Sequence, residues 1–250
     1  MSDLHIPYEF TELLDALKDN YGDKETTVVF NGDIIDAEGI SSFPKTMDHT
    51  LLHEILRASE WIGEFSKVFK NVILLSGNHE RRVDRLAKND KVAQIMPFLN
   101  NILDVLQYEI KYDILSEKIV YGERYSNVYS YNSRFFRIGN VLFSHPQNFR
   151  KVPGATVRGT IETAVNMGID FDIMVIGHTH QIQQISDYGK KGIETGCLTK
   201  NISYLTRAGK FSKKPDIGYG LLNFVNGFCE MYEAIDMSYS SFVKNRRGNL

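Results

Sequence analysis

Four short apolar segments of this chain each end at side chains that can bind a metal or move a proton, and this pattern constrains the fold most. The segment Val72 to Leu75 is apolar throughout and runs into Gly77-Asn78-His79-Glu80. A strand that is apolar on both faces needs a covering layer on each side, which favours a central strand of an α/β fold. Similar segments end before Asp33, His145 and His178. Because open α/β sheets bind ligands beyond the carboxyl ends of their strands, we expect these side chains to form one site.

Length and composition are those of an ordinary globular protein. A chain of 250 residues, 42% apolar and 24% charged, allows one large α/β domain or two small ones. The net charge of −2 excludes a protein dominated by non-specific nucleic-acid binding, so only a local basic patch could serve such a partner. Two cysteines, Cys197 and Cys229, fit a reduced compartment. No apolar run approaches a membrane span and no signal peptide opens the chain, so we expect no membrane partner and a cytoplasmic location.

The rest of the pattern predicts a single domain over residues 1–250, with a helical elaboration at 81–116. Apolar spacing predicts helices at Phe10–Asn20, Leu51–Phe69 and Ala155–Met167, and mostly helix from Arg81 to Tyr108. The tyrosine-rich stretch from Lys118 to Arg137 predicts antiparallel strands or a lid. Short strands are expected around residues 182–185, 193–195 and 221–225.

The candidate ligands are nitrogen and oxygen donors without a thiolate among them. Asp3 and His5 are two residues apart, as are His178 and His180, and an extended backbone would point each pair to one side. The full set is too large for one four-coordinate metal and suits two metals that share a bridging carboxylate. Mixed imidazole and carboxylate ligands favour Mn, Fe or Zn over Ca or Mg. Such a pair, roughly 3.5–4 Å apart, clamps the attacking and leaving oxygens of a displacement at phosphorus. The donors are Asp3, His5, Asp33, Asn78, His145, His178 and His180.

In these motifs the chain resembles the calcineurin-like metallophosphoesterases, and in particular their short, cap-less bacterial and phage-encoded members. Five blocks appear in the order of that family and span Asp3 to His180. They are Asp3-Leu4-His5, Gly32-Asp33-Ile34-Ile35-Asp36, Gly77-Asn78-His79-Glu80, the lone His145 and Gly177-His178-Thr179-His180.

The resemblance implies a four-layer α/β/β/α sandwich with two divalent metal ions at its rim. Asp3, His5 and His180 would bind one ion, Asn78, His145 and His178 the other, and Asp33 would bridge them. Mn is the expected metal, with Fe, Zn and Ni as alternatives.

The resemblance also implies catalytic roles for two residues that are not ligands. His79 matches the histidine that protonates the leaving oxygen, while a metal-bridging hydroxide attacks phosphorus. Asp36 would orient the loops of the site or His79, and its alternative role is a turn residue or a helix cap.

The chain departs from the family at two places. Met1 stands two residues before Asp3, where relatives carry a full apolar strand, so we expect residues upstream in the native chain or another segment in that place. Ala37-Glu38 replaces the arginine-glycine by which phosphoprotein phosphatases grip phosphate, which favours other substrates.

Basic side chains suggest how a substrate phosphate would be held. Arg81 and Arg82 follow the catalytic block, and either neutralise substrate phosphate or pair with acids of their own helix. The stretch from Lys200 to Lys214 is basic and contains no acid, so it is either a solvated loop or an edge that follows a nucleic acid.

The function predicted from these features is hydrolysis of a phosphate ester by a cytoplasmic enzyme, in the host cytoplasm if a phage encodes it. Phosphodiester substrates such as nucleotides, DNA or RNA are favoured over phosphoproteins. The alternatives are a phosphomonoesterase or protein phosphatase, and a metal-binding scaffold without catalysis.

Overall fold

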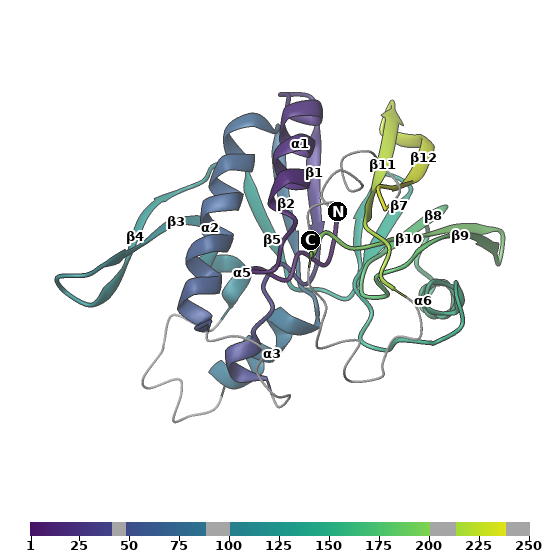
Figure 1. The fold of residues 1–250 in the computed structure, drawn as a ribbon. Coiled ribbons are helices and arrows are strands. Elements are labelled where there is room, and N and C mark those ends of the chain that lie inside the picture. Colours follow the sequence, from purple (N-terminus) through teal and green to yellow (C-terminus); the bar gives the residue numbers. More distant parts are fainter. Residues whose placement is uncertain (42–48, 89–100, 201–213, 239–250) are drawn as a thin grey trace. The chain divides into compact units, whose positions relative to one another are not determined.

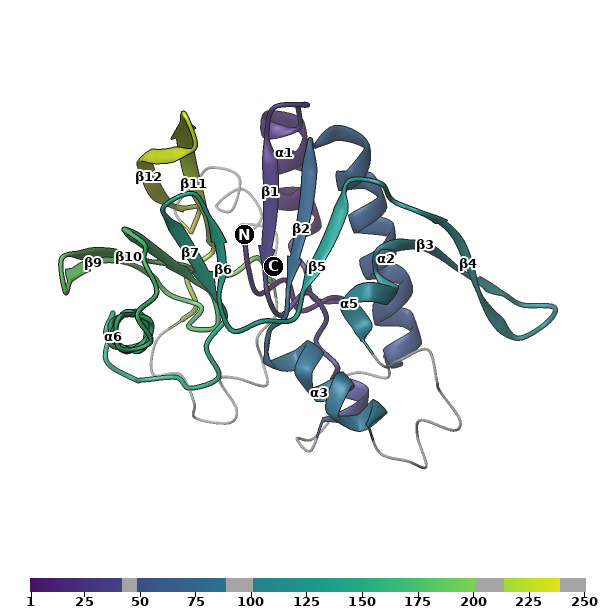
Figure 2. The same cartoon turned by 180° about the vertical axis from the view of Figure 1, so that it is seen from behind.

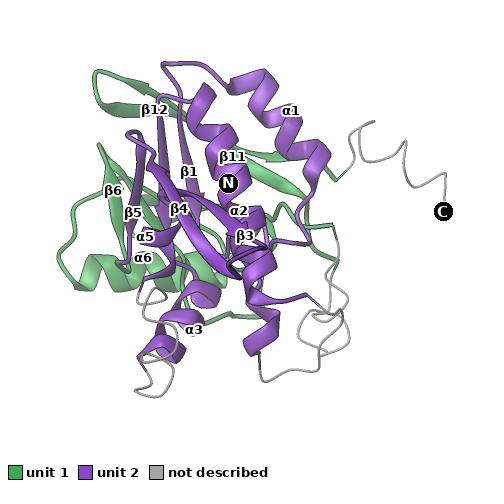
Figure 3. Cartoon of the chain, turned by 90° about the vertical axis from the view of Figure 1, so that its left-hand side faces the viewer, with its two compact units in different colours: residues 1–3, 133–250 green, residues 4–132 purple. Residues whose placement is uncertain are grey.

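The computed structural model describes residues 1–41, 49–88, 101–200 and 214–238. The chain forms two compact units, coloured separately in Figure 3. The N-terminal unit holds residues 4–132, and the C-terminal unit holds residues 1–3 and 133–250. The expectation that residues 1–250 make a single domain stays a prediction.

The N-terminal unit contains a three-stranded parallel sheet with β2 in the middle (Figure 1). Its strands are β1 (Thr27–Asn31), β2 (Asn71–Leu75) and β5 (Val128–Tyr131). Residues Val72 to Leu75 are all buried, as their unbroken apolar run predicts for a central strand. The carboxyl end of β2 leads directly into α3 (Asn78–Ala87), and β1 ends just before Asp33.

Helix α2 (Leu51–Val68) covers this sheet because its apolar side chains recur at helical spacing. Thr50 caps its first turn by accepting a hydrogen bond from the N–H of His53 at 3.2 Å. The ring of Phe65 meets that of Phe30 on β1 edge-on, with centroids 5.3 Å apart. Within the described residues of the unit, the other helical elements are α1 (Thr11–Tyr21), the short 3₁₀ helix η1 (Glu38–Ile40) and α5 (Ile102–Val105).

An antiparallel hairpin of β3 (Tyr108–Asp113) and β4 (Lys118–Arg124) extends from the N-terminal unit (Figure 2). The helical elaboration expected at 81–116 is therefore wrong over β3, where residues 108–113 pair with β4. Residues 78–87 and 102–105 are helical, and residues 89–100 lie outside the described part. The antiparallel pairing expected from Lys118 to Arg137 is confirmed for β4 and is wrong for β5, which pairs in parallel with β2.

The C-terminal unit contains a five-stranded mixed sheet in the order β6-β7-β8-β10-β9. One face is covered by α6 (Ala155–Asn166), whose Val157, Ile161 and Ala164 pack into one core cluster with side chains of β7 and β8. The described part of the unit also contains a second hairpin, β11 (Gly218–Val225) with β12 (Phe228–Asp236). The strands of the larger sheet are β6 (Phe136–Ile138), β7 (Val141–Ser144), β8 (Ile173–Ile176), β9 (Ile182–Asp187) and β10 (Lys190–Thr195).

The two units together confirm the mixed α/β class, since each carries a sheet with a helix packed on it. None of the helices within the described residues is long and apolar enough to cross a membrane.

Candidate metal centre

The turn after β1 places the Asp33 carboxylate against the first turn of α3. Gly32 and Asp33 both have positive φ, 84° and 51°, which reverses the chain tightly. Oδ1 of Asp33 accepts a hydrogen bond from the N–H of His79 at 3.0 Å. Gly77 makes this approach possible, because a Cβ there would lie only 2.1 Å from Oδ1 of Asp33.

Glu80 fixes the same turn from the other side. Its fully buried carboxylate accepts hydrogen bonds from four backbone N–H groups, those of Gly77, Asp33, Ile34 and Ile35, at 2.8 to 3.1 Å. Four charge-assisted bonds to a buried carboxylate give a rigid anchor. Glu80 belongs to the Gly77-Asn78-His79-Glu80 motif, but the motif alone predicted no role for it. Its position three residues into a helix was the available signal.

Asp36 is hydrogen-bonded to two histidine rings, which meet edge-on with centroids 4.6 Å apart. Its Oδ1 lies 2.7 Å from Nδ1 of His5, and its carbonyl oxygen is hydrogen-bonded to Nδ1 of His79. With both Nδ1 atoms engaged, Nε2 of each ring faces Oδ2 of Asp33, at 3.9 Å for His5 and 3.8 Å for His79. A carboxylate that engages one ring nitrogen and leaves the other for the ion is the usual support of a metal-bound histidine.

Burial changes the protonation of His79. Removal from solvent is the main cause that lowers its pKa to about 4, while the negative charges of Asp33 and Asp36 work in the opposite direction. The neutral ring therefore prevails at pH 7. Since Nδ1 donates its hydrogen to a carbonyl, Nε2 is the atom that can take up or release a proton.

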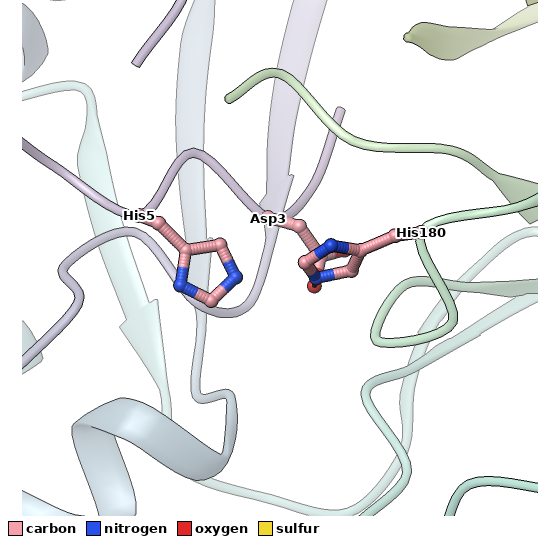
Figure 4. Close-up of side chains that lie close together, drawn as sticks. All are labelled: Asp3, His5 and His180. Atoms are coloured by element: carbon pink, nitrogen blue, oxygen red, sulfur yellow. Dashed lines mark ion pairs between the residues drawn. The ribbon is translucent and has the colours of Figure 1, made fainter. Parts of the chain in front are cut away.

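The C-terminal unit brings a second group of predicted ligands together around Asp3. Oδ1 of Asp3 lies 3.0 Å from Nε2 of His180, and Figure 4 shows the carboxylate of Asp3 beside that ring. Both oxygens of Asp3 accept from the N–H of His178, at 3.1 and 2.9 Å. The rings of His145, which follows β7, and His178 meet edge-on with centroids 5.3 Å apart. Two ligands of one ion with bonds of about 2.1 Å lie roughly 3–4 Å apart, so the Asp3–His180 spacing suits a shared ion.

Five of the seven predicted ligands have a left-handed backbone. They are Asp3, His5, Asp33, His178 and His180, with φ between 49° and 78°, among nine such residues other than glycine in the described part of the chain. The extended backbone expected for the pairs Asp3/His5 and His178/His180 is therefore wrong. Each such residue costs of order 1–3 kcal/mol and persists where the surroundings require it, commonly at functional sites.

The side-chain oxygen of Asn78 indicates that these residues fit a metal ion. Its Oδ1 is a buried atom, and no described residue offers it a hydrogen bond. A buried amide oxygen without a donor is costly in a protein interior, whereas a cation satisfies it directly. Together with a donor set made only of imidazole nitrogens and side-chain oxygens, this fits a divalent ion of the Mn, Fe or Zn type.

The two predicted phosphate-binding arginines occupy different environments. NH1 of Arg82 donates to the carbonyl oxygens of Asp36 and Ala37 at 3.3 and 3.2 Å, so part of this guanidinium serves the loop. Arg81 is half-buried, and burial lowers the pKa of its guanidinium while the charge of Asp33 raises it. In the basic stretch from Lys200 to Lys214, residues 201–213 lie outside the described part of the chain.

Comparisons with known proteins show the family. A family model described as calcineurin-like phosphoesterase matches residues 1–182, and the chain belongs to that family. It is thereby a metal-dependent phosphoesterase, a hydrolase that acts on ester bonds, as its motifs predicted. No curated protein matches the chain.

Solved structures with a similar fold share little sequence with this chain. An archaeal phosphodiesterase is 16% identical, with 95% of this chain and 97% of that chain covered and a TM-score of 0.45. Vps29 from Entamoeba histolytica, solved with zinc, is 14% identical over 94% and 96% of the two chains, with a TM-score of 0.43. A metallophosphoesterase from Sphaerobacter thermophilus is 13% identical over 88% and 80%, with a TM-score of 0.42.

Proposed function

We propose that this metallophosphoesterase hydrolyses phosphodiesters of the nucleotide or nucleic-acid type with two divalent ions, Mn in the first place. The observation that carries the proposal is the left-handed backbone at five of the predicted ligands, a cost that metal binding explains. The proposed ligands are Asp3, His5, Asp33, Asn78, His145, His178 and His180, with Asp33 as the bridge.

When bound, such ions supply a hydroxide at neutral pH and neutralise charge on the phosphate. The protein's part is to hold the donors in place beforehand. Glu80 fixes the backbone around Asp33, and Asp36 fixes the ring of His5 with Nε2 directed at Oδ2 of Asp33. Because these supports are buried and hydrogen-bonded, little reorganisation is needed when substrate binds.

His79 is proposed to protonate the leaving oxygen through Nε2. The bond from Nδ1 to the carbonyl oxygen of Asp36 fixes the ring and leaves Nε2 for the substrate. A neutral ring cannot donate from that atom, so a proton has to arrive there first. The negative charge of a bound phosphate favours protonation of Nε2, and the positive charge of bound ions opposes it.

Substrate preference follows from the supply of positive charge. A phosphodiester carries one negative charge, and two metal ions supply most of the stabilisation that it needs. A phosphomonoester dianion needs further donors, for which Arg81 and Arg82 are the candidates, and Arg82 already donates to two backbone carbonyls. Because part of the Arg82 guanidinium serves the loop, the supply of positive charge favours a diesterase, and Arg81 and Arg82 both stay proposed phosphate contacts.

The test compares bis-nitrophenyl phosphate, nitrophenyl phosphate, a phosphopeptide and short single- and double-stranded DNA under one Mn concentration. We expect turnover of the diester to exceed that of the monoester and of the phosphopeptide. Efficient phosphopeptide hydrolysis with little diester activity would contradict the proposed substrate class.

A further inference from the structure

Glu54 of α2 is a buried acid that lies next to the candidate site without belonging to any of its motifs. Its side chain has no exposed surface. Oε2 accepts a hydrogen bond from the N–H of Ala37 at 2.5 Å, and the N–H of Glu38 also interacts with this carboxyl group. An acid on the buried face of a helix is uncommon unless a partner requires it, so its partner indicates its role.

That partner is one end of a single peptide group. The N–H of Ala37 and the carbonyl of Asp36 belong to the same planar unit, which rotates only as a whole. Glu54 accepts from the N–H end, and Nδ1 of His79 is hydrogen-bonded to the oxygen end. Any rotation that releases Glu54 therefore moves the acceptor that orients His79.

The chain needs this support at that place because Ala37 has φ of 50°, a left-handed conformation that a residue with a Cβ adopts at a cost. Arg82 holds the same turn by donating to the carbonyl oxygens of Asp36 and Ala37, and therefore acts on the carbonyl side alone. Among the described residues that hydrogen-bond this turn, Glu54 supplies the acceptor for the N–H side.

We propose that Glu54 is a positioning residue for His79, acting through the peptide group between Asp36 and Ala37. The proposal rests on the catalytic role of His79 proposed above. The acceptor oxygen of residue 54 fixes the plane of the peptide, the peptide oxygen fixes the imidazole ring, and the ring presents Nε2 to the leaving group. A displacement of about 1 Å remote from the reacting atoms can slow turnover by roughly 10².

The activity test uses two phosphodiesters that differ in leaving group, diphenyl phosphate and bis-nitrophenyl phosphate, with the Mn-loaded enzyme. Glu54→Leu should lower kcat for diphenyl phosphate by roughly 10- to 100-fold, with KM nearly unchanged. The loss should be several-fold smaller for bis-nitrophenyl phosphate, because nitrophenolate leaves without a proton. Glu54→Gln keeps an oxygen for the N–H of Ala37 and should stay within about 3-fold of wild type.

Ser59→Ala is the matched control. Ser59 lies on the same helix and is equally buried, but its hydroxyl contacts the backbone of Tyr108 and Ile110 in the hairpin. It should not alter the ratio of the two substrates. His79→Ala separates the two proposals. If it shows no dependence on the leaving group, the role of His79 is wrong. If it does and Glu54→Leu does not, the role of Glu54 is wrong.

A measurement on metal-free protein needs no turnover. The ¹⁵N spectrum of His79 should show the Nδ1–H tautomer in wild type and in Glu54→Gln, and a mixture of tautomers in Glu54→Leu. If the Leu variant does not fold, the Gln variant still decides: a loss of more than 10-fold on diphenyl phosphate, or a changed tautomer, would overturn the proposal.

Discussion

Replacing Glu54 by Gln should make the protein more stable at neutral pH, by an amount that grows as pH rises. Removal from solvent is the main cause that raises the pKa of Glu54 to about 8, from an ordinary value of 4.5. The N–H of Ala37 acts in the opposite direction, and the nearby Asp36 and Glu38 raise the pKa further. Between pH 4.5 and 8 the folded protein thus keeps a proton that the unfolded chain has lost.

The sign and size of this stability difference follow from the number of protons that the folded and unfolded states bind. Because the folded state binds more protons in this window, the free energy of unfolding falls by about 1.4 kcal/mol for each pH unit. Relative to low pH, the buried Glu54 side chain should therefore reduce the free energy of unfolding by about 0.7 kcal/mol at pH 5 and by about 3 kcal/mol at pH 7. Gln carries no titrating proton, so its unfolding free energy should lack this slope.

Urea unfolding of the metal-free protein measures the effect, and Trp61 is a convenient fluorescent reporter because it lies buried on the same helix as Glu54. At pH 7 the midpoint of Glu54→Gln should exceed that of wild type by roughly 1–3 M urea, and at pH 5 the two should nearly coincide. Ser59→Ala, at another buried position of that helix, removes no ionisable group and should leave the pH profile unchanged. Parallel pH profiles for wild type and Glu54→Gln would refute the reasoning.

Three further outcomes are expected. Asp33→Asn should lose metal ions and turnover together, as measured by elemental analysis and assay. Gly77→Ala places a Cβ at 2.1 Å from Oδ1 of Asp33 and should destabilise the fold by roughly 1–3 kcal/mol, whereas Gly39→Ala, with 3.6 Å of room, should not. With a folded pKa of about 4, His79 should lower the unfolding free energy of metal-free protein by about 1.4 kcal/mol for each pH unit from 6.5 down to 4, and His79→Gln should remove that loss in acid unfolding.

The sequence predicted those parts of the fold and site that depend on short, local patterns. The unbroken apolar run of β2 predicted a central strand, and the strand is buried throughout. The residues after β1 and β2 meet as expected for neighbouring parallel strands, since Asp33 accepts from the N–H of His79. Helix was predicted up to residue 116, although aromatic and apolar side chains alternate at Tyr108, Ile110 and Tyr112 as in a strand. This local signal is weak because β3 is stabilised by pairing with β4, which lies several residues further along the chain.

The sequence could not predict features that depend on contacts between residues far apart in the chain. Glu54 has helical spacing with the buried Ala58, Trp61 and Phe65, so an acid at a core position was a visible signal. Its partner, the peptide after Asp36, could not be named from the sequence. The left-handed backbone at Asp3 and His180 was likewise hidden, because propensity alone favours such φ values only weakly for these residue types.

His79 needs one direct check, because its Nε2 lies as close to Oδ2 of Asp33 as that of His5 does. As a proton donor it should leave metal content unchanged when replaced by Ala, while turnover of diphenyl phosphate falls by roughly 10²–10⁴. Loss of an ion from His79→Ala would make His79 a ligand.

The central claim is that phosphodiester hydrolysis depends on two divalent ions per chain. The most direct measurement strips the protein with EDTA and titrates Mn back while bound metal and turnover of bis-nitrophenyl phosphate are followed together. The account predicts that activity rises to its maximum at two equivalents of bound Mn. Full activity at one equivalent, or none at two, would contradict it.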